Sequence, residues 1–171
     1  MTGTPGAAGT GWIPVGGPPL KAAPLRAVDF WRVEHSDPGL TMSVRVQVRG
    51  EDPNLRGHFP GLAVFPGVFV VEALCQAMVL ALPESAPRLR TVRSVRFLAP
   101  LLDGDELNLE ITATPRAGGG WYAFGEGWRS DGTAAARIRA DFERGDADHA
   151  DRQRTDTQGS VTAAVGEAAH A

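Results

Sequence analysis

The chain has 171 residues, of which 43% are hydrophobic, and its formal net charge is −3. This length and composition suit one domain with a substantial core, and no internal repeat or second block of composition argues for two. The sequence has no basic excess of the kind that marks a nucleic-acid surface, and no apolar run is long enough to span a bilayer. We therefore expect a protein that binds neither nucleic acid nor a membrane.

Cys75 is the only cysteine, which excludes an intrachain disulfide and a cysteine-cluster metal site. The four histidines are also far apart in sequence, so we expect no metal. Absence of a disulfide framework favours a cytoplasmic location. Because Cys75 lies in an apolar segment, we interpret it as a small core residue and not as a nucleophile.

Both ends of the chain differ in composition from the middle. Residues 1–23 are rich in Gly and Pro and lack the pattern of a signal peptide, so they are predicted to be a flexible leader. Within this leader, Trp12 and Ile13 either pack onto the body of the protein or are incidental apolar residues. Residues 145–171 hold two Arg and five acidic residues and are predicted to be a disordered acidic tail. This leaves residues 24–144 as a single domain.

The first half of that domain is predicted to begin with a hairpin. Ordered structure starts in residues 24–33, and Pro38 and Gly39 then turn the chain. Residues 40–49 alternate between apolar and polar side chains, as a half-buried strand does. Residues 50–54 lead by turn chemistry into the next loop.

A loop punctuated by two Pro-Gly steps follows, and it runs into an apolar helix predicted over residues 68–82. Pro66 and Gly67 suit the start of a helix, where a missing N–H does no harm. Only Glu72 and Gln76 are strongly polar in this helix, which predicts burial on every face. Such a helix must be wrapped by other elements.

Four strands are predicted after the helix, in residues 87–97, 106–112, 121–129 and 133–142. Gly118 to Gly120 indicate a hairpin tip, and Asp131-Gly132 is a typical hairpin dipeptide. The order of two strands, a buried helix and four strands predicts the α+β class, with one antiparallel sheet curled around the helix.

Glu72 and Gln76 are four residues apart and so form one polar stripe on the helix. A carboxylate in an apolar helix is costly unless it is paired or protonated, and such groups concentrate at functional sites. The alternative is that Glu72 is a paired structural residue and that His58, in the loop, is an ordinary surface side chain.

Residues 57–77 resemble the signature of the β-hydroxyacyl-acyl-carrier-protein dehydratases of the hotdog fold. That pattern is G-H-F-P-G, then P-G-V, then E-A-x-x-Q-A, and every position is filled here, with His58 fourteen positions before Glu72. Residues 96–107 also look like the family's R-F-x-x-P and P-G-D-x-L passage. The resemblance covers roughly residues 24–143. It implies an antiparallel sheet wrapped around a long central apolar helix.

The resemblance implies dehydration of a 3-hydroxyacyl thioester, and this reaction needs three devices. A base is needed for the α-proton, and His58 is the candidate. An acid is needed for the leaving hydroxide, and Glu72 is the candidate if apolar burial keeps it partly protonated. An oxyanion site is also needed, and the N–H groups of Gly67 and Val68 at the helix start could supply it.

Two further residues complete the predicted site. The N–H of Phe59 is a candidate for orienting the thioester. Gln76 either orients Glu72 from one turn further along the helix or is a satisfied core amide. In the family, the His of one protomer works with the acid of the other, so the resemblance implies a homodimer or an oligomer of dimers.

The implied substrate carrier is an acyl carrier protein, whose phosphopantetheine arm holds the acyl chain, and no cofactor is expected. Arg88, Arg90, Arg93 and Arg96 form the densest basic cluster, which either docks this acidic partner or is simply solvated. The pathway is fatty-acid or polyketide biosynthesis. Two rival functions remain: a hotdog acyl-thioester hydrolase, and a non-catalytic hotdog subunit of a heterodimer.

Overall fold

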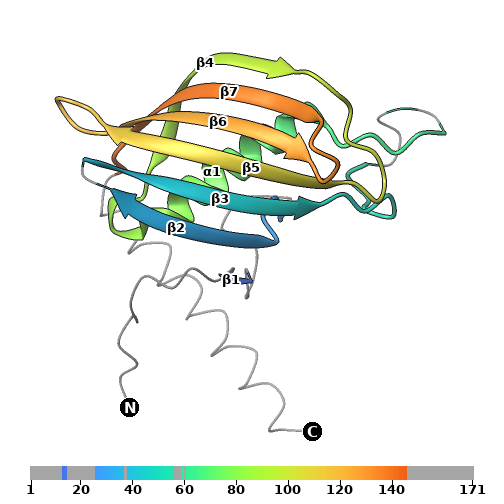
Figure 1. Cartoon of the computed structure of the whole chain (residues 1–171). Coiled ribbons are helices and arrows are strands. Elements are labelled where there is room, and N and C mark those ends of the chain that lie inside the picture. The colour runs from blue at the N-terminus through green and yellow to red at the C-terminus, as the bar shows by residue number, and fades with distance from the viewer. Residues whose placement is uncertain (1–12, 15–25, 37, 56–58, 60, 146–171) are drawn as a thin grey trace, which may run out of the picture.

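The computed structural model contains one helix packed against one curved sheet (Figure 1). It describes residues 13–14, 26–36, 38–55, 59 and 61–145. The described strands and helices, in chain order, are β1 (Ile13–Pro14), β2 (Phe30–Ser36), β3 (Gly39–Gln47), α1 (Gly67–Ala81), a short 3₁₀ turn (Pro83–Ser85), β4 (Arg88–Phe97), β5 (Glu106–Pro115), β6 (Trp121–Arg129) and β7 (Ala134–Glu143). The predicted order of strands and helix is confirmed.

The strands form a single antiparallel sheet in the order β1-β2-β3-β5-β6-β7-β4. Strands β5, β6 and β7 follow one another as hairpins, whereas β4, which comes directly after the helix, pairs with β7 at the far edge. The sheet curves around α1, which lies against one of its faces (Figure 1). This is the α+β hotdog arrangement that the sequence predicted.

Alternation along the strands decides which face of the sheet meets the helix. Val44, Val46 and Val48 are each at most 2% exposed, while Arg45 and Gln47 between them lie on the other face. In the hairpins, Gly118 to Gly120 have φ between +80° and +93°, a backbone conformation that glycine adopts without strain. The predicted strand faces and the predicted hairpin tip are therefore confirmed.

The helix has the 15 residues that the sequence pattern predicted, and it begins and ends one residue earlier than expected. At about 22 Å of axial length, it is not the long helix that the resemblance implied. Prolines set both limits: Pro66 is the N-cap residue, and Pro83 begins the 3₁₀ turn directly after the C-cap.

The prediction that the helix is buried on every face is wrong for the single chain. Ala73, Leu74 and Met78 are completely buried, but Val68 is 65% exposed and Val71 is half-buried. The reason is geometric, because one sheet can cover only one side of a helix. An apolar strip of α1 therefore remains open.

The two edges of the sheet also differ. At one edge, Ile13 pairs with Trp31 of β2, so the segment whose role the sequence left open adds a short strand. At the other edge, the side chains of Leu89 and Val92 in β4 are 39% and 44% exposed. Trp12, most of the predicted leader and nearly all of the predicted tail lie outside the described residues. Within the described ranges, no helix combines the length and apolarity needed to cross a bilayer.

Candidate active site

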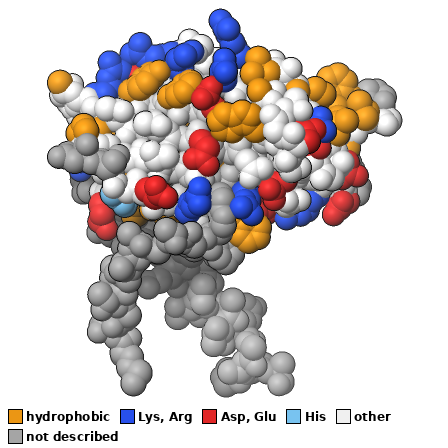
Figure 2. Space-filling model, in the orientation of Figure 1, with side chains coloured by type: hydrophobic (Ala, Val, Ile, Leu, Met, Phe, Trp, Pro, Cys, Tyr) orange, Lys and Arg blue, Asp and Glu red, His pale blue; other side chains and the backbone are white. Residues whose placement is uncertain are grey.

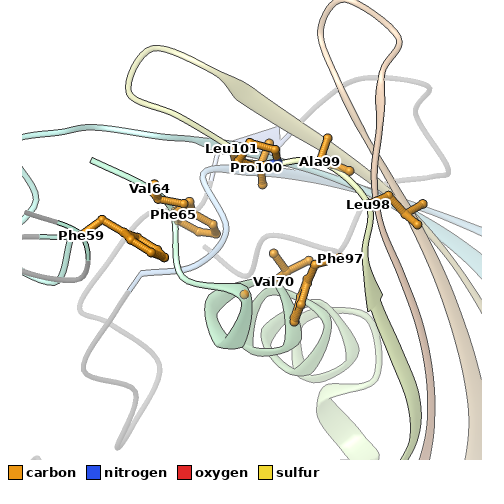
Figure 3. Close-up of a pocket in the computed structure, with 11 residues that line it drawn as sticks. Phe59, Val64, Phe65, Val70, Phe97, Leu98, Ala99, Pro100 and Leu101 are labelled. Atoms are coloured by element: carbon orange, nitrogen blue, oxygen red, sulfur yellow. The ribbon is translucent and has the colours of Figure 1, made fainter. Parts of the chain in front are cut away.

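The start of α1 opens into a pocket of about 360 Å³ (Figure 3). Pro66 makes no side-chain cap hydrogen bond, and the first turn contains no acidic side chain. The first N–H groups of a helix have no partner within the helix, and they carry its positive dipole end. A polar oxygen at the head of an otherwise apolar ligand would find donors at this end of the pocket.

Among the described residues, those that line the pocket are apolar or glycine. They come from four segments: the loop before the helix, the first turn of the helix, residues 97–101 at and after the end of β4, and Ala135 of β7. Phe65, Val70 and Leu101 are buried, whereas Phe59 and Phe97 are 50% and 56% exposed. The pocket therefore has a buried apolar wall and two exposed aromatic rings, which Figure 3 shows on opposite sides of it.

Gly67, the first residue of the helix, lies directly under the ring of Phe97. A Cβ added at Gly67 would lie 2.6 and 2.8 Å from Cε2 and Cε1 of that ring, and closer still to Cζ. Real Cβ atoms do not approach neighbours so closely. The far end of the Phe97 ring therefore fills the space that a side chain at position 67 would need, and the ring would have to turn away to admit one.

Glu72 and Gln76 form a hydrogen-bonded pair further along the helix. The Nε2 of Gln76 donates to Oε1 of Glu72 at 2.8 Å, and the backbone N–H of Ala27 donates to Oε1 of Gln76 at 3.0 Å. The bond from Ala27 takes the carbonyl oxygen of the amide, so its NH₂ group must face Glu72. Gln76 is buried and Glu72 is half-buried, which fits a role for Gln76 in orienting the acid.

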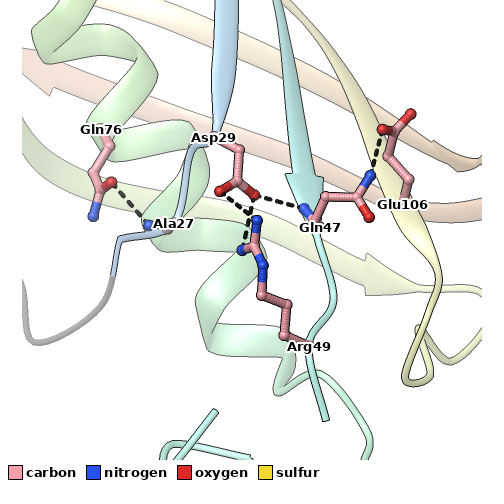
Figure 4. A network of polar contacts seen from close by, with 6 residues as sticks. All are labelled: Ala27, Asp29, Gln47, Arg49, Gln76 and Glu106. Carbon is pink, nitrogen blue, oxygen red and sulfur yellow. Dashed lines mark hydrogen bonds and ion pairs between the residues drawn. The ribbon is translucent and has the colours of Figure 1, made fainter. Parts of the chain in front are cut away.

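A polar network holds the segment that carries Ala27 (Figure 4). Asp29 accepts the backbone N–H of Gln47 at 2.7 Å and pairs with Arg49 at 3.1 Å. The side chain of Gln47 in turn donates to Glu106 at 2.6 Å. These bonds tie the chain ahead of β2 to β3 and β5, and so fix the position of the Ala27 N–H beside Gln76.

The pocket and the polar pair lie on different sides of α1. Val70 lines the pocket, and Glu72 is two residues further on, which is about 200° around a helix of 3.6 residues per turn. Glu72 is not among the residues that line the pocket. One chain therefore does not bring the candidate acid and the apolar pocket together.

Cys75 lies next to the polar pair but does not have the character of a nucleophile. Burial, together with the negative charge of Glu72, raises the pKa of the Cys75 thiol to about 12. A thiol of this kind is almost entirely protonated at neutral pH. Its interpretation as a core residue agrees with this environment.

The six predicted site residues fall into three groups. Phe59 and Gly67 line the pocket, and Val68 follows Gly67 with an exposed side chain. Glu72 and Gln76 form the polar pair. His58 lies outside the described residues, so its proposed role stays a prediction, although its neighbour Phe59 lies at the pocket.

The sequence did not single out the residues that form the far wall of the pocket. Phe97, Leu98 and Pro100 belong to the R-F-x-x-P passage, and this motif was the available signal. Among the described residues, no three His, Cys, Asp or Glu side chains come together as a metal site would require.

Comparison with known proteins identifies the family. Residues 34–135 match the model of the ApeI-like family, described as ApeI dehydratase. The chain belongs to this ApeI-like dehydratase family. It also shares the fold of a chain from the dehydratase heterocomplex ApeI:P of Xenorhabdus doucetiae, with a TM-score of 0.51 and 17% identity over 66% of this chain and 95% of that one.

Relatives of the ApeI-like chain include enzymes named 3-hydroxyacyl-[acyl-carrier-protein] dehydratase FabZ. The protein from Anaeromyxobacter sp. (strain K) is 34% identical over 135 residues, which is 71% of this chain and 85% of the relative. The protein from Symbiobacterium thermophilum is 38% identical over 86 residues, which is 47% of this chain and only 61% of the relative. The resemblance to the β-hydroxyacyl-acyl-carrier-protein dehydratases is thereby confirmed.

Proposed function

We propose that this chain is a dehydratase that removes water from a 3-hydroxyacyl thioester on an acyl carrier protein, giving the 2-enoyl thioester. The observation that carries the proposal is the apolar pocket between Phe59 and Gly67, which opens on the uncapped start of α1. An acyl chain would fill the apolar space, and its thioester oxygen would meet the helix N–H groups. The FabZ-named relatives support the same chemistry.

In the proposed reaction, one C–H and one C–O bond break and a C=C bond forms. His58 takes the α-proton, and the electron pair of that C–H bond becomes the second bond of the alkene. Glu72 gives a proton to the departing hydroxyl, which leaves as water. The N–H groups of Gly67 and Val68 stabilise the negative charge that builds on the thioester oxygen, and the N–H of Phe59 helps to orient the thioester.

We further propose that the catalytic unit is a homodimer. Three apolar side chains are exposed: Val68 on the helix, and Leu89 and Val92 on the edge strand. An exposed apolar surface of this kind is typical of an interface. A second copy would cover this surface. It could also bring its Glu72 to a pocket that the single chain leaves without an acid. A higher oligomer of such dimers, and a heterodimer with another hotdog subunit, are the alternatives.

The proposed partner is an acyl carrier protein that docks on the basic rim along β4. Figure 2 shows Lys and Arg side chains gathered along the upper rim of the molecule. Arg93 is already paired, because it donates to Asp141 at 2.6 Å and Asp141 also pairs with Arg116. Burial alone would raise the pKa of Asp141, but the bond from Arg93 and the charge of Arg116 outweigh it and hold the pKa below its usual value.

Arg88, Arg90 and Arg96 are therefore the better candidates for steering an acidic carrier. No cofactor is proposed beyond the phosphopantetheine that the carrier itself brings. The pathway, fatty-acid or polyketide biosynthesis, and the cytoplasmic location remain predictions.

The deciding experiment uses the purified chain alone with a crotonyl thioester. Hydration of the double bond supports the proposal, and the loss of the absorbance of the conjugated thioester measures it. Release of free thiol without hydration identifies an acyl-thioester hydrolase instead. If the chain is inert alone but active with a second hotdog subunit, it is one half of a heterodimer and the homodimer proposal is wrong.

A further inference from the structure

The ring of Phe97 stands apart from the other walls of the pocket. Phe65, Val70, Leu101 and Ala135 are each at most 7% exposed and belong to the core, so their positions are fixed by packing. Phe97 is the last residue of β4 and is 56% exposed, yet its ring lies against the first residue of α1. Like Phe59 and Leu98, it has little support from the rest of the core, but it alone of these three lies against Gly67.

Its position matters because it lies over the end of the pocket where the helix donors are. Three ring atoms of Phe97 occupy the space where a Cβ of residue 67 would lie. An acyl thioester whose oxygen meets the N–H of Gly67 must therefore pass its first carbons along this ring. Among the described residues, no other side chain comes as close to that space.

We propose that Phe97 is the specificity-determining residue of the acyl pocket, where its ring limits which acyl chains reach the start of α1. This inference rests on the proposed function for its choice of ligand, an acyl thioester. The lining supports that choice, because none of the described residues that form it has a charged or polar side chain. The volume of 360 Å³ is at the lower end for ligand pockets, so one phenyl ring is a large part of the available space.

The same geometry gives a second explanation for Gly67. The sequence suggested that glycine stands there to admit the thioester. In the structure, the ring of Phe97 already fills the space that a Cβ would need. Gly67 and Phe97 therefore form a matched pair, and a change at one should depend on the residue at the other.

The first test measures binding, not turnover, with saturated butyryl-, hexanoyl- and decanoyl-pantetheine and isothermal titration calorimetry. In Phe97→Ala, the ratio of decanoyl to butyryl affinity should rise roughly tenfold over wild type, because removing the ring opens space for a longer chain. Phe97→Leu, a milder change in case the alanine variant folds poorly, should give a smaller rise. Phe30→Ala is the matched control, since Phe30 is an exposed phenylalanine of β2 that does not line the pocket.

A ratio that stays within about twofold of wild type in both Phe97 variants would overturn the inference. A rise of the same size in Phe30→Ala would also overturn it, because the effect would then come from the loss of any exposed phenylalanine and not from the ring at the pocket. If the wild-type chain binds none of the three acyl probes, the pocket does not take acyl chains and the inference fails.

The second test is a double-mutant cycle on thermal stability. Gly67→Ala should lower Tm by several degrees when Phe97 is present, because the new Cβ collides with the ring. In the Phe97→Ala background, the same change should leave Tm level or raise it, since alanine is the better helix former. Equal effects of Gly67→Ala in the two backgrounds would mean that the ring does not lie over Gly67.

The binding and hydration assays separate the inference from the proposed function. If the wild-type chain hydrates crotonyl thioester and the affinity ratios are unchanged in the variants, the dehydratase proposal stands and the role of Phe97 falls. If no hydration occurs but the ratio shifts in Phe97→Ala, the acyl-binding role of Phe97 stands and the dehydratase proposal falls.

Discussion

The first turn of α1 and its middle turns carry two different halves of a site. The first turn opens on a pocket that the described residues line with apolar side chains, whereas the middle of the helix holds the carboxylate of Glu72 and the amide of Gln76. Apolar side chains can bind an acyl chain but cannot move a proton. A hydrogen-bonded acid can move a proton but offers no space for a chain.

The separation of the pocket from the Glu72–Gln76 pair gives a reason why the sheet encloses α1 only partly. The pocket lies on the side of α1 that Val70 faces, and Glu72 lies about 200° around the helix from it. A catalytic centre needs both halves within reach of one substrate. The simplest way to unite them is a two-fold arrangement in which each chain supplies one half to the other.

The largest expected effect comes from removing a proton-transfer group. Glu72→Gln should lower kcat for hydration by roughly 10²–10⁴-fold, since in this reverse direction residue 72 must take a proton from the attacking water, which an amide cannot do. His58→Ala should have an effect of the same size. Steady-state assays with a crotonyl thioester measure both.

Stability separates a catalytic effect from a folding effect in these variants. Glu72→Gln conserves volume on a half-buried position, so its Tm should remain close to that of wild type. Full activity in a folded sample of either variant would contradict the assigned roles.

The next largest effect is a recovery of activity. Co-expressed His58→Ala and Glu72→Gln chains should form mixed dimers with one intact site, giving roughly a quarter of wild-type activity when pairing is random. Differently tagged chains and tandem purification isolate the mixed dimers, which should have roughly half of wild-type activity because one of their two sites is intact. If demonstrated mixed dimers are inactive, each site takes both groups from a single chain and the division into two halves is wrong.

Much of this division could be predicted from the sequence because it depends on local patterns. The alternation in residues 40–49 follows from the period of a strand, and the Glu72–Gln76 spacing follows from the period of a helix. The prolines around the helix can likewise be read from the sequence. The open side of the helix could not be predicted, because composition records that a face is apolar but not what covers it. The bond between Ala27 and Gln76, 49 positions apart, and the contact of Phe97 with Gly67 depend on how distant segments pack.

Gln76→Met tests whether the amide positions the acid. The change conserves volume but leaves the buried N–H of Ala27 without its acceptor, which should cost about 1–3 kcal/mol of stability. Because Glu72 would also lose its donor, kcat should fall by on the order of tenfold with little change in KM. Chemical denaturation and hydration kinetics measure the two effects.

Gln47→Met is the matched control for this variant. It removes the bond from Gln47 to Glu106, which lies in the network ahead of β2 and not at Glu72. The control should lose some stability but keep the wild-type kcat. If both variants lower kcat equally, Gln76 acts only through stability.

A smaller effect is expected at the basic rim. Reversing Arg88 and Arg90 to Glu should raise KM for carrier-bound substrate several-fold at low salt, because the acidic carrier is no longer attracted. The difference should shrink as the ionic strength rises. A pantetheine substrate without the carrier should be turned over as by wild type, and an equal loss on both substrates would refute docking at this rim.

The smallest expected effect is on the reactivity of Cys75, which lies next to Glu72 and Gln76 in the polar half of the site. Its pKa of about 12 means that the thiolate is a minute fraction at pH 8, so iodoacetamide should react far more slowly with the native protein than with the unfolded chain. The rate should rise about tenfold per pH unit below this pKa, because only the thiolate reacts. Glu72→Gln removes the negative charge that helps to raise the pKa and should accelerate the reaction roughly two- to fivefold.

Glu84→Gln removes one negative charge from an exposed position on the 3₁₀ turn and is the control for a general change in net charge. Mass spectrometry of the alkylated protein over pH 7–9 gives the rates. Because burial is the larger cause of the raised pKa, the thiol should stay slow in both variants compared with the unfolded chain. Identical rates in wild type and Glu72→Gln would mean that residue 72 places no negative charge beside Cys75, and the expected effect of Glu72 on the thiol would be wrong.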